Sequence, residues 1–276
     1  MAVTKSTRYY FSPDTPFWRI NSHVLVNLAG ARALLLELAH PLVAAGVAEH
    51  SNYRGDPFGR LYRTMRTMNQ IMFNDVEGSR EGLRYFNRCH AKVKGELWEA
   101  VGPLPSRARY RAADPLLKLW VLATLYDSCL LVYDHFVAPL SLDDKRDYYR
   151  DGLLLGQLLG IPPDMMLATY DDFADYMATM INSNLLTVSD TARNIVEALF
   201  APPLFGPFAR TASFVGIGLL PQRIRNEFGF EWDTKREKRL HQLAALSRRV
   251  RPLLPHFVAA NPQALIAERR IRLARN

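Results

Sequence analysis

Apolar residues recur along most of this chain at intervals of three and four positions, the period of an α-helix with one buried face. No stretch shows the sustained alternation of apolar and polar residues that is typical of hairpin strands. Helix-start signals, each a capping residue followed by proline or an early acid, occur at Asp56, Asp114, Ser141, Thr169 and Ser189. Stop signals occur at Gly102, Gly160, Pro202 and Gly229. The pattern predicts an all-α protein of about eight to ten helices.

Four predicted helices bear on a possible site. The first covers about residues 31–50 and contains Pro41, which must kink or break it because proline lacks a backbone N–H. The second covers residues 56–73, and its apolar stripe is Leu61, Met65, Met68 and Met72. The third covers about residues 75–97, and its stripe is Leu83, Phe86, His90, Val93 and Leu97. The fourth, residues 114–136, is apolar on nearly every face, which predicts a central and buried helix.

Length and composition predict one large folded domain. The chain has 276 residues, of which 49% are hydrophobic and 22% charged, so it does not resemble a disordered protein. We expect a flexible N-terminal segment over residues 1–15 and an all-helical domain over residues 16–276. The longest charge-free run has 16 residues and three prolines, whereas a membrane-spanning helix needs roughly 20 apolar residues. With no apolar leader and two cysteines, the chain is expected to be cytoplasmic.

The net charge of +8 comes largely from basic clusters late in the chain, at residues 235–239, 248–251 and 269–275. Three interpretations stay open: solvated helix faces, peripheral contact of the C-terminal helices with an anionic membrane, and nucleic-acid binding. No zinc finger or aromatic-basic RNA motif supports the third, so we expect no nucleic-acid partner. The sequence does not indicate an oligomeric state.

His90 occupies a core position in an otherwise apolar helical stripe. A buried imidazole must find a hydrogen-bond partner, and a backbone carbonyl would be the structural explanation. The functional explanation is an axial ligand to a haem held between helices, because haem needs one nitrogen donor on an apolar wall. Periodicity alone leaves both open.

Arg60, Arg63 and Thr64 form the second candidate feature. The two arginines are three positions apart and therefore share a helix flank. They are either solvent-facing charge or a polar rim over a cavity, where a guanidinium or hydroxyl would bind an oxidant or a haem propionate.

Other chemistries lack their motifs. Glu37 and His40 form a Glu-x-x-His pair, half of a di-iron carboxylate motif, but none of the other six histidines has Glu three residues before it. The chain contains no G-x-S-x-G, Walker loop, G-x-G-x-x-G or H-E-x-x-H pattern. Hydrolase, nucleotide-binding and zinc-protease functions therefore have no support.

Together these segments resemble a known family. LLLELAHPLVAAGVAEHSNYRGDPFGRLYRTM, the His of NRCHAKVKG, DPLLKLWVLATLYDS and the late LLPQRIRNEFGFEW are similar to oxygenases of the MpaB and latex-clearing (rubber oxygenase) type. The resemblance covers roughly residues 16–271. It implies an all-α single domain with a globin-like core and additional C-terminal helices. It also implies haem b as cofactor and cleavage of carbon–carbon double bonds in isoprenoid substrates with dioxygen.

By motif position, the resemblance implies that His90 is the haem iron ligand and that Arg60 and Thr64 are distal polar residues. Rubber oxygenases have an iron-ligating lysine where this chain has Arg63. A guanidinium has no free lone pair, so Arg63 cannot replace that ligand and would instead stabilise bound oxygen or pair with a propionate. We therefore expect a five-coordinate or water-bound resting haem. Glu49 is the candidate for the family's distal base.

The resulting hypothesis is a haem b-dependent oxygenase that acts with dioxygen on a small hydrophobic substrate, isoprenoid or lipid-like. Two alternatives stay open: a non-enzymatic haem- or gas-binding protein, and a cofactor-free helical lipid-binding module. The sequence does not distinguish the first alternative from the oxygenase, because both need the same iron ligand.

Overall fold

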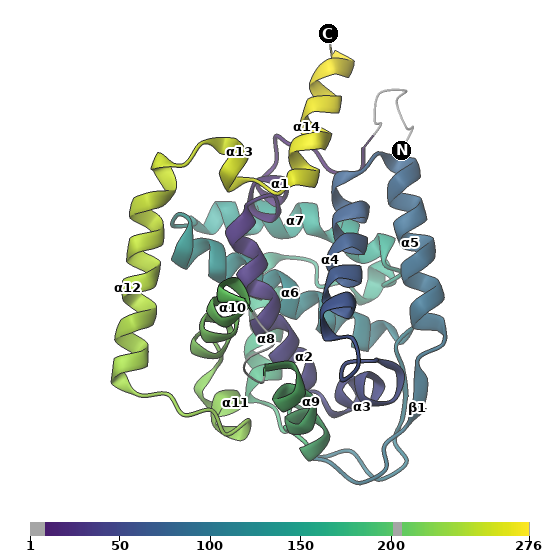
Figure 1. The fold of residues 1–276 in the computed structure, drawn as a ribbon. Helices are drawn as coiled ribbons and strands as arrows, with labels where there is room; N and C mark the ends of the chain where they lie inside the picture. Colours follow the sequence, from purple (N-terminus) through teal and green to yellow (C-terminus); the bar gives the residue numbers. More distant parts are fainter. Residues whose placement is uncertain (1–8, 201–205, 276) are drawn as a thin grey trace.

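The computed structural model describes residues 9–200 and 206–275, and Figure 1 shows its arrangement of helices. The all-α class is confirmed, because the one described sheet has two strands of three residues each. The α-helices are α1 (Pro16–Asn21), α2 (Ala29–Leu38), α3 (Pro41–His50), α4 (Pro57–Phe73), α5 (Val76–Ala91), α6 (Pro115–Phe136), α7 (Leu142–Leu158), α8 (Tyr170–Asn182), α9 (Asp190–Phe200), α10 (Pro207–Gly218), α11 (Gln222–Glu227), α12 (Thr234–Val250), α13 (His256–Ala259) and α14 (Pro262–Arg275). The strands are β1 (Lys94–Glu96) and β2 (Arg109–Arg111), and the 3-10 helices are η1 (Val24–Leu28), η2 (Pro163–Met165) and η3 (Arg251–Leu253).

Helix α6 lies at the centre of the molecule, as its all-round apolar sequence predicts (Figure 1). It packs against α1, α2, α7, α8 and α12. Among the described residues, α6 is the only unbroken helix that is long enough and apolar enough to cross a membrane. Inside this protein, however, 61% of its most apolar window is buried, which favours the core of a globular fold.

The helix predicted over residues 31–50 is broken at Pro41, as proline allows. Its two parts are α2 and α3, and the segments 24–38 and 41–50 meet at 106°. Pro41 starts α3, and the ring of His40 caps it, because Nδ1 accepts a hydrogen bond from the N–H of Leu42 over 3.3 Å. The break turns α3 toward the β1–β2 hairpin and α9.

The helix predicted over residues 75–97 is too long, and this prediction is wrong at its end. Helix α5 ends at Ala91, and the chain turns into β1, which pairs antiparallel with β2. Three-residue strands are too short to show a period of two, so the sequence pattern does not reveal them. Leu97 therefore belongs to a separate small core with Tyr110 and not to the His90 stripe.

The helix-start signals are confirmed at all five positions, because capping depends on local contacts. Fourteen described α-helices exceed the prediction of about eight to ten, since short helices such as α1, α11 and α13 carry no clear periodicity. Of the stop signals, Gly102 lies in a hairpin turn with φ of 56°, and Pro202 lies outside the described residues. In the predicted N-terminal segment, Phe11 stacks on Phe17 in the core, and residues 1–8 lie outside the described part.

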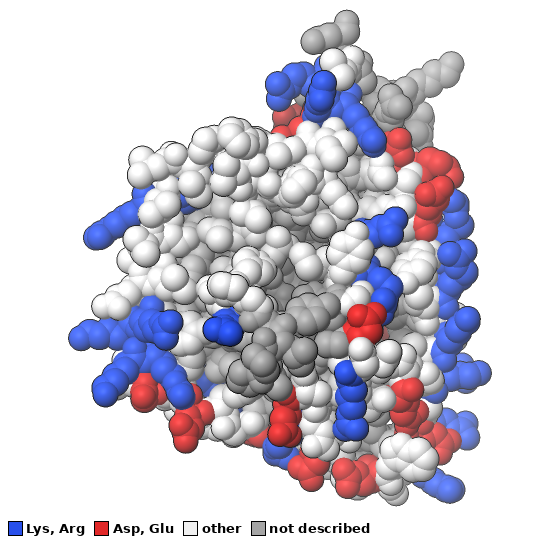
Figure 2. Space-filling model, viewed as in Figure 1, with Lys and Arg blue, Asp and Glu red and all other residues white. Residues whose placement is uncertain are grey.

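Charge is unevenly distributed over the surface. Figure 2 shows a broad uncharged area over α10, α13 and the upper half of α12, with Lys and Arg at its edges. The acidic side chains visible in this view lie around that area, mainly along the lower edge and the right.

Candidate functional site

His90 lies in the last turn of α5, a helix that Asp75 caps through a hydrogen bond from the N–H of Gly78. Its Nδ1 donates to the carbonyl oxygen of Phe86 over 2.9 Å, and the two rings stack with centroids 3.8 Å apart. Burial, and to a smaller degree the cation of Lys118 on α6, lower the pKa of His90 below the usual range of histidine. The ring is therefore neutral at pH 7.

A neutral imidazole with Nδ1–H bound to a carbonyl has its lone pair on Nε2. No described residue forms a hydrogen bond with Nε2 of His90. Such a carbonyl bond fixes the tautomer and ring orientation of metal-binding histidines. The same bond exists between His135 and the carbonyl of Leu131, so the bond alone is not diagnostic. His90 is distinguished by its ring stack and its desolvated position.

A second group of polar side chains joins α2, α4 and α6. Burial raises the pKa of Glu37 to about 7, although the nearby Arg60 cation and a hydrogen bond with the Thr124 hydroxyl act in the opposite direction. Burial also lowers the pKa of Arg60, which nevertheless remains a cation. The structure thus brings Arg60 together with an acid that changes protonation near neutral pH.

The sequence pattern did not identify Glu37 as the acid beside Arg60. The signal was present: Glu37 is the one acidic residue between residues 20 and 48, and a single acid in an apolar helix is expected to have a partner. In the sequence, Glu37 also forms half of a di-iron motif with His40, and that pattern points to a metal instead of to Arg60. The distance in sequence between Glu37 and Arg60 conceals this interaction, because the turn at Pro41 lies between the two residues.

Arg63 and Thr64 face outward on α4. The Nη1 of Arg63 lies 2.9 Å from an oxygen of Asp56, the residue that caps this helix, and about half of each side chain is exposed. The Thr64 hydroxyl donates to the carbonyl oxygen of Arg60 over 3.1 Å. The structure therefore gives Arg60 and Arg63 different partners, although they share one flank of α4.

Glu49 lies at the end of α3, beside the β1–β2 hairpin. Its carboxylate accepts hydrogen bonds from the Tyr110 hydroxyl over 2.5 Å and from the Trp98 indole over 2.9 Å. A Cβ at Gly95 would lie 2.6 Å from this carboxylate, so any side chain there would have to displace Glu49. These contacts connect Glu49 with the hairpin, whereas the acid that interacts with Arg60 is Glu37.

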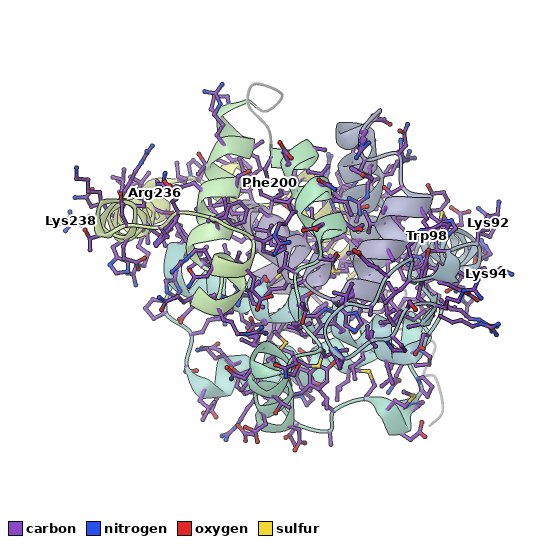
Figure 3. All side chains as sticks on the ribbon, turned by 90° about the horizontal axis from the view of Figure 1, so that it is seen from below. Lys92, Lys94, Trp98, Phe200, Arg236 and Lys238 are labelled. Carbon is purple, nitrogen blue, oxygen red and sulfur yellow. The ribbon has the colours of Figure 1, made fainter. Side chains whose placement is uncertain are left out.

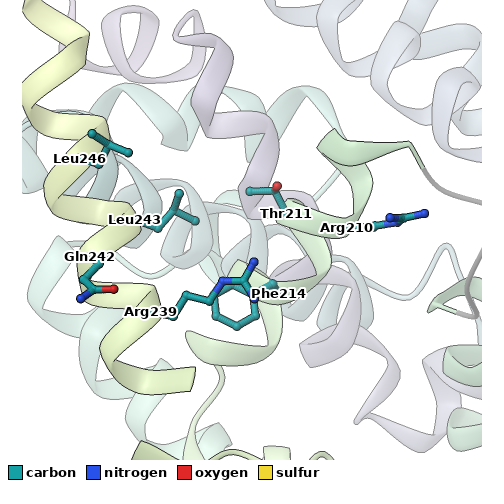
Figure 4. Close-up of a pocket in the computed structure, with 7 residues that line it drawn as sticks. All are labelled: Arg210, Thr211, Phe214, Arg239, Gln242, Leu243 and Leu246. Carbon is teal, nitrogen blue, oxygen red and sulfur yellow. The ribbon is translucent and has the colours of Figure 1, made fainter. Parts of the chain in front are cut away.

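Neither of the two described pockets is lined by His90, Arg60 or Glu37. A small one of about 90 Å³ adjoins Glu49 and Trp98, and Figure 3 shows Trp98 at the hairpin side with Lys92 and Lys94, across the molecule from Arg236 and Lys238. A larger groove of about 490 Å³ lies between α10 and α12 and contains none of the predicted site residues (Figure 4). Its lining residues are Arg210, Thr211, Phe214, Arg239, Gln242, Leu243 and Leu246.

Comparisons with known proteins agree with the sequence resemblance. The model of the family described as ER-bound oxygenase mpaB/B'/Rubber oxygenase, catalytic domain, matches residues 18–249. The uncharacterized protein Rv2237 of Mycobacterium tuberculosis is 27% identical over 240 residues, covering 83% of this chain and 90% of its own length. The uncharacterized protein Mb2261 of Mycobacterium bovis has the same identity and coverage. No solved structure gives a significant match. Because the family match spans most of the chain, the protein belongs to the family of mpaB-type and rubber oxygenase catalytic domains.

Proposed function

We propose that this chain is a haem b-dependent oxygenase that uses dioxygen to oxidise or cleave a carbon–carbon double bond in a hydrophobic substrate, isoprenoid or lipid-like. Membership of an oxygenase family supports the reaction class. The proposal of haem as cofactor depends on one observation. His90 is a neutral, half-buried imidazole, and its Nε2 has no hydrogen-bond partner among the described residues. A haem requires such a nitrogen on an otherwise apolar wall.

The chemistry of the candidate residues fits this group. Glu37, Arg60 and His90 are each partly accessible, and burial shifts the pKa of each. Nε2 of His90 would bind the iron, and the carbonyl of Phe86 would hold the ring in position. Arg60 and the half-buried Lys118 are cations suited to the haem carboxylates.

When bound, the haem supplies the activation of dioxygen that oxidation of an alkene requires. Glu37 would hold or release a proton at its carboxyl oxygen at neutral pH, a property that a surface carboxylate lacks. Arg60 favours the ionised form of Glu37. We therefore assign to Glu37 the proton-handling role expected of Glu49, whose carboxylate is held by Tyr110 and Trp98.

Arg63 and Thr64 remain predicted distal residues. Arg63 would reach a bound ligand by leaving Asp56, and its guanidinium cannot coordinate iron in any rotamer. Arg63 would therefore add no second protein ligand to the iron, which suits the binding of a small oxidant.

The first test compares the absorption spectra of the full chain and two alanine variants, all supplied with haem. His90→Ala should lose or shift the Soret band, because it removes the iron ligand. His135→Ala is the matched control, since His135 makes the same bond to a carbonyl four residues earlier and should leave the band unchanged. Circular dichroism should show the parental helix content in both variants.

Two outcomes would contradict this assignment: no Soret band in the parent after haem supplementation, or equal effects of the two variants. For the haem-loaded parent, steady oxygen consumption that depends on an added terpenoid alkene distinguishes an oxygenase from a haem or gas carrier.

A further inference from the structure

The chain that follows α12 exposes seven consecutive residues without a Lys, Arg, Asp or Glu, Pro252 to Val258. Four of them are large and apolar: Leu253 is 80% exposed, Phe257 71%, Val258 46% and Leu254 41%. Single exposed apolar residues are ordinary, but a contiguous set indicates an interaction site. This segment covers the end of η3 and most of α13, at the upper left of Figure 1.

The exposed apolar surface continues onto α12. The buried face of α12 holds Leu240 and Ala244, and the Ser247 hydroxyl donates to the carbonyl oxygen of Phe136 over 2.7 Å. With that face against the core, Leu246 and Val250 remain 58% and 41% exposed. We define the apolar edge by its members: Leu246, Val250, Leu253, Leu254, Phe257 and Val258.

The charge around the apolar edge is mainly positive. Residues 238–267 contain no Asp or Glu and five Lys or Arg residues. Arg248 and Arg249 are exposed beside the edge, and Figure 2 shows basic side chains at the border of the uncharged area. Glu268, the next acid in sequence, is 18% exposed: one oxygen accepts a hydrogen bond from the Trp18 indole over 3.0 Å, and the other lies 3.9 Å from Nε2 of His256.

The groove between α10 and α12 adjoins the same surface, because Leu246 belongs to both. The guanidinium carbon of Arg239 lies over the ring of Phe214, 5.2 Å from the ring centroid. Figure 4 shows Arg239 reaching from α12 toward Phe214 on α10, with Leu243 and Leu246 farther along α12. A groove with a cation beside apolar side chains is complementary to a molecule that has an anionic head and an apolar tail.

We propose that the apolar edge and its basic border dock on the surface of an anionic lipid bilayer. Leucine and phenylalanine side chains would enter the boundary between headgroups and acyl chains, and arginines would bind lipid phosphates. The excess of positive charge over residues 238–267 favours this occupant over a second copy of the chain, since two such edges would repel each other. This inference does not depend on haem, but it would place the protein where hydrophobic substrates dissolve.

The test is sedimentation of the full chain with vesicles of phosphatidylcholine alone or of an equimolar mixture with phosphatidylglycerol. We expect binding to the anionic vesicles and weak binding to the neutral ones, with the difference decreasing as salt is added. Neutralisation by Arg248→Gln with Arg249→Gln should weaken binding roughly 30-fold. Arg80→Gln with Arg84→Gln removes the same charge from α5 and is the matched control.

A second pair of variants tests insertion. The double variant Leu253→Ser with Phe257→Ser should reduce binding at least about tenfold. The two serines have little apolar surface to transfer from water into the bilayer. Trp98→Ser is the control, because Trp98 is 89% exposed on the hairpin, across the molecule from Arg236 and Lys238 of α12 (Figure 3). This variant should have little effect on vesicle binding. Equal binding to both vesicle types, or an unchanged affinity of the Leu253 and Phe257 variant, would refute membrane docking. A dimer in light scattering that this variant converts to a monomer would assign the edge to a second copy instead.

Discussion

A carboxyl group enclosed by protein beside one cation titrates differently from a carboxyl group in water, and Glu37 is such a group. Burial disfavours its charged form more strongly than Arg60 and Thr124 favour it, so its pKa rises from 4.5 to about 7. Below pH 7 the acid is mostly protonated, and above it the carboxylate predominates. At the scale of the residue, the property that suits Glu37 to proton transfer is this balance.

We predict that the rate of the haem-loaded enzyme rises with pH through a midpoint near 7 if the Glu37 carboxylate acts as a base. Glu37→Gln should remove this midpoint and lower the rate on the order of 100-fold. Arg60→Met should move the midpoint upward, because Arg60 lowers the pKa of Glu37. Substrate-dependent oxygen consumption, measured across pH for the parent and the two variants, gives the rate and the midpoint. An unchanged profile in Glu37→Gln would exclude the assigned role, while its haem spectrum would still report on His90.

At the scale of the element, the contact between α2 and α10 depends on the absence of a side chain. A Cβ at Gly216 would lie 2.7 Å from the Cβ of Ala31 and 2.9 Å from the backbone nitrogen of Arg32. Contacts this short with backbone atoms cannot be relieved by rotating a side chain. Helix α10 is therefore held against α2, the helix that carries Glu37, more closely than two helices with ordinary side chains would allow.

Gly216→Ala should therefore lower the free energy of unfolding by about 1–3 kcal/mol, because α2 and α10 must separate. Gly30→Ala is the matched control: an added Cβ meets nothing within 4 Å there, and alanine favours the helix by up to about 1 kcal/mol. Urea denaturation of both variants gives the comparison. A loss of stability in Gly30→Ala equal to that in Gly216→Ala would show that helix contact is not the cause.

At the scale of the whole molecule, Arg32 connects three parts of the fold. Its guanidinium lies 2.7 Å from a carboxylate oxygen of Asp127 and 2.8 Å from the Ser128 hydroxyl, both on α6. Its Nε donates to the carbonyl of Leu219, at the end of α10, over 2.9 Å. Arg32 is 4% exposed and Asp127 is 30% exposed, so water has little access to the guanidinium that joins α2, α6 and α10.

Replacing it by Arg32→Met should lower the free energy of unfolding by about 3 kcal/mol, since Asp127 and the carbonyl of Leu219 lose their partner. Arg150→Met tests an exposed pair: Arg150 lies 2.8 Å from Asp147 and is 67% exposed. Its cost should stay within about 1 kcal/mol. Thermal and urea unfolding of the two variants provide the measurement, and similar losses in both would contradict the importance of the buried contacts.

Features that depend on neighbouring residues could be predicted from the sequence. The five capped helix starts, the break at Pro41 and the buried character of α6 follow from side-chain chemistry within one or two helical turns. The family, too, follows from motifs of adjacent residues such as the segment around Arg60 and Thr64. The predicted roles of His90, Arg63, Thr64 and Glu49, and the cytoplasmic location, remain predictions.

Tertiary structure decided which polar groups meet. Glu37 and Glu49 both precede Arg60 in sequence, but the turn of 106° between segments 24–38 and 41–50 separates them. Glu37 then interacts with Arg60, and Glu49 is bound by Tyr110 of the short hairpin that periodicity did not reveal. The pKa of a carboxyl group depends on the charges and the solvent around it, and these are supplied by residues distant in sequence.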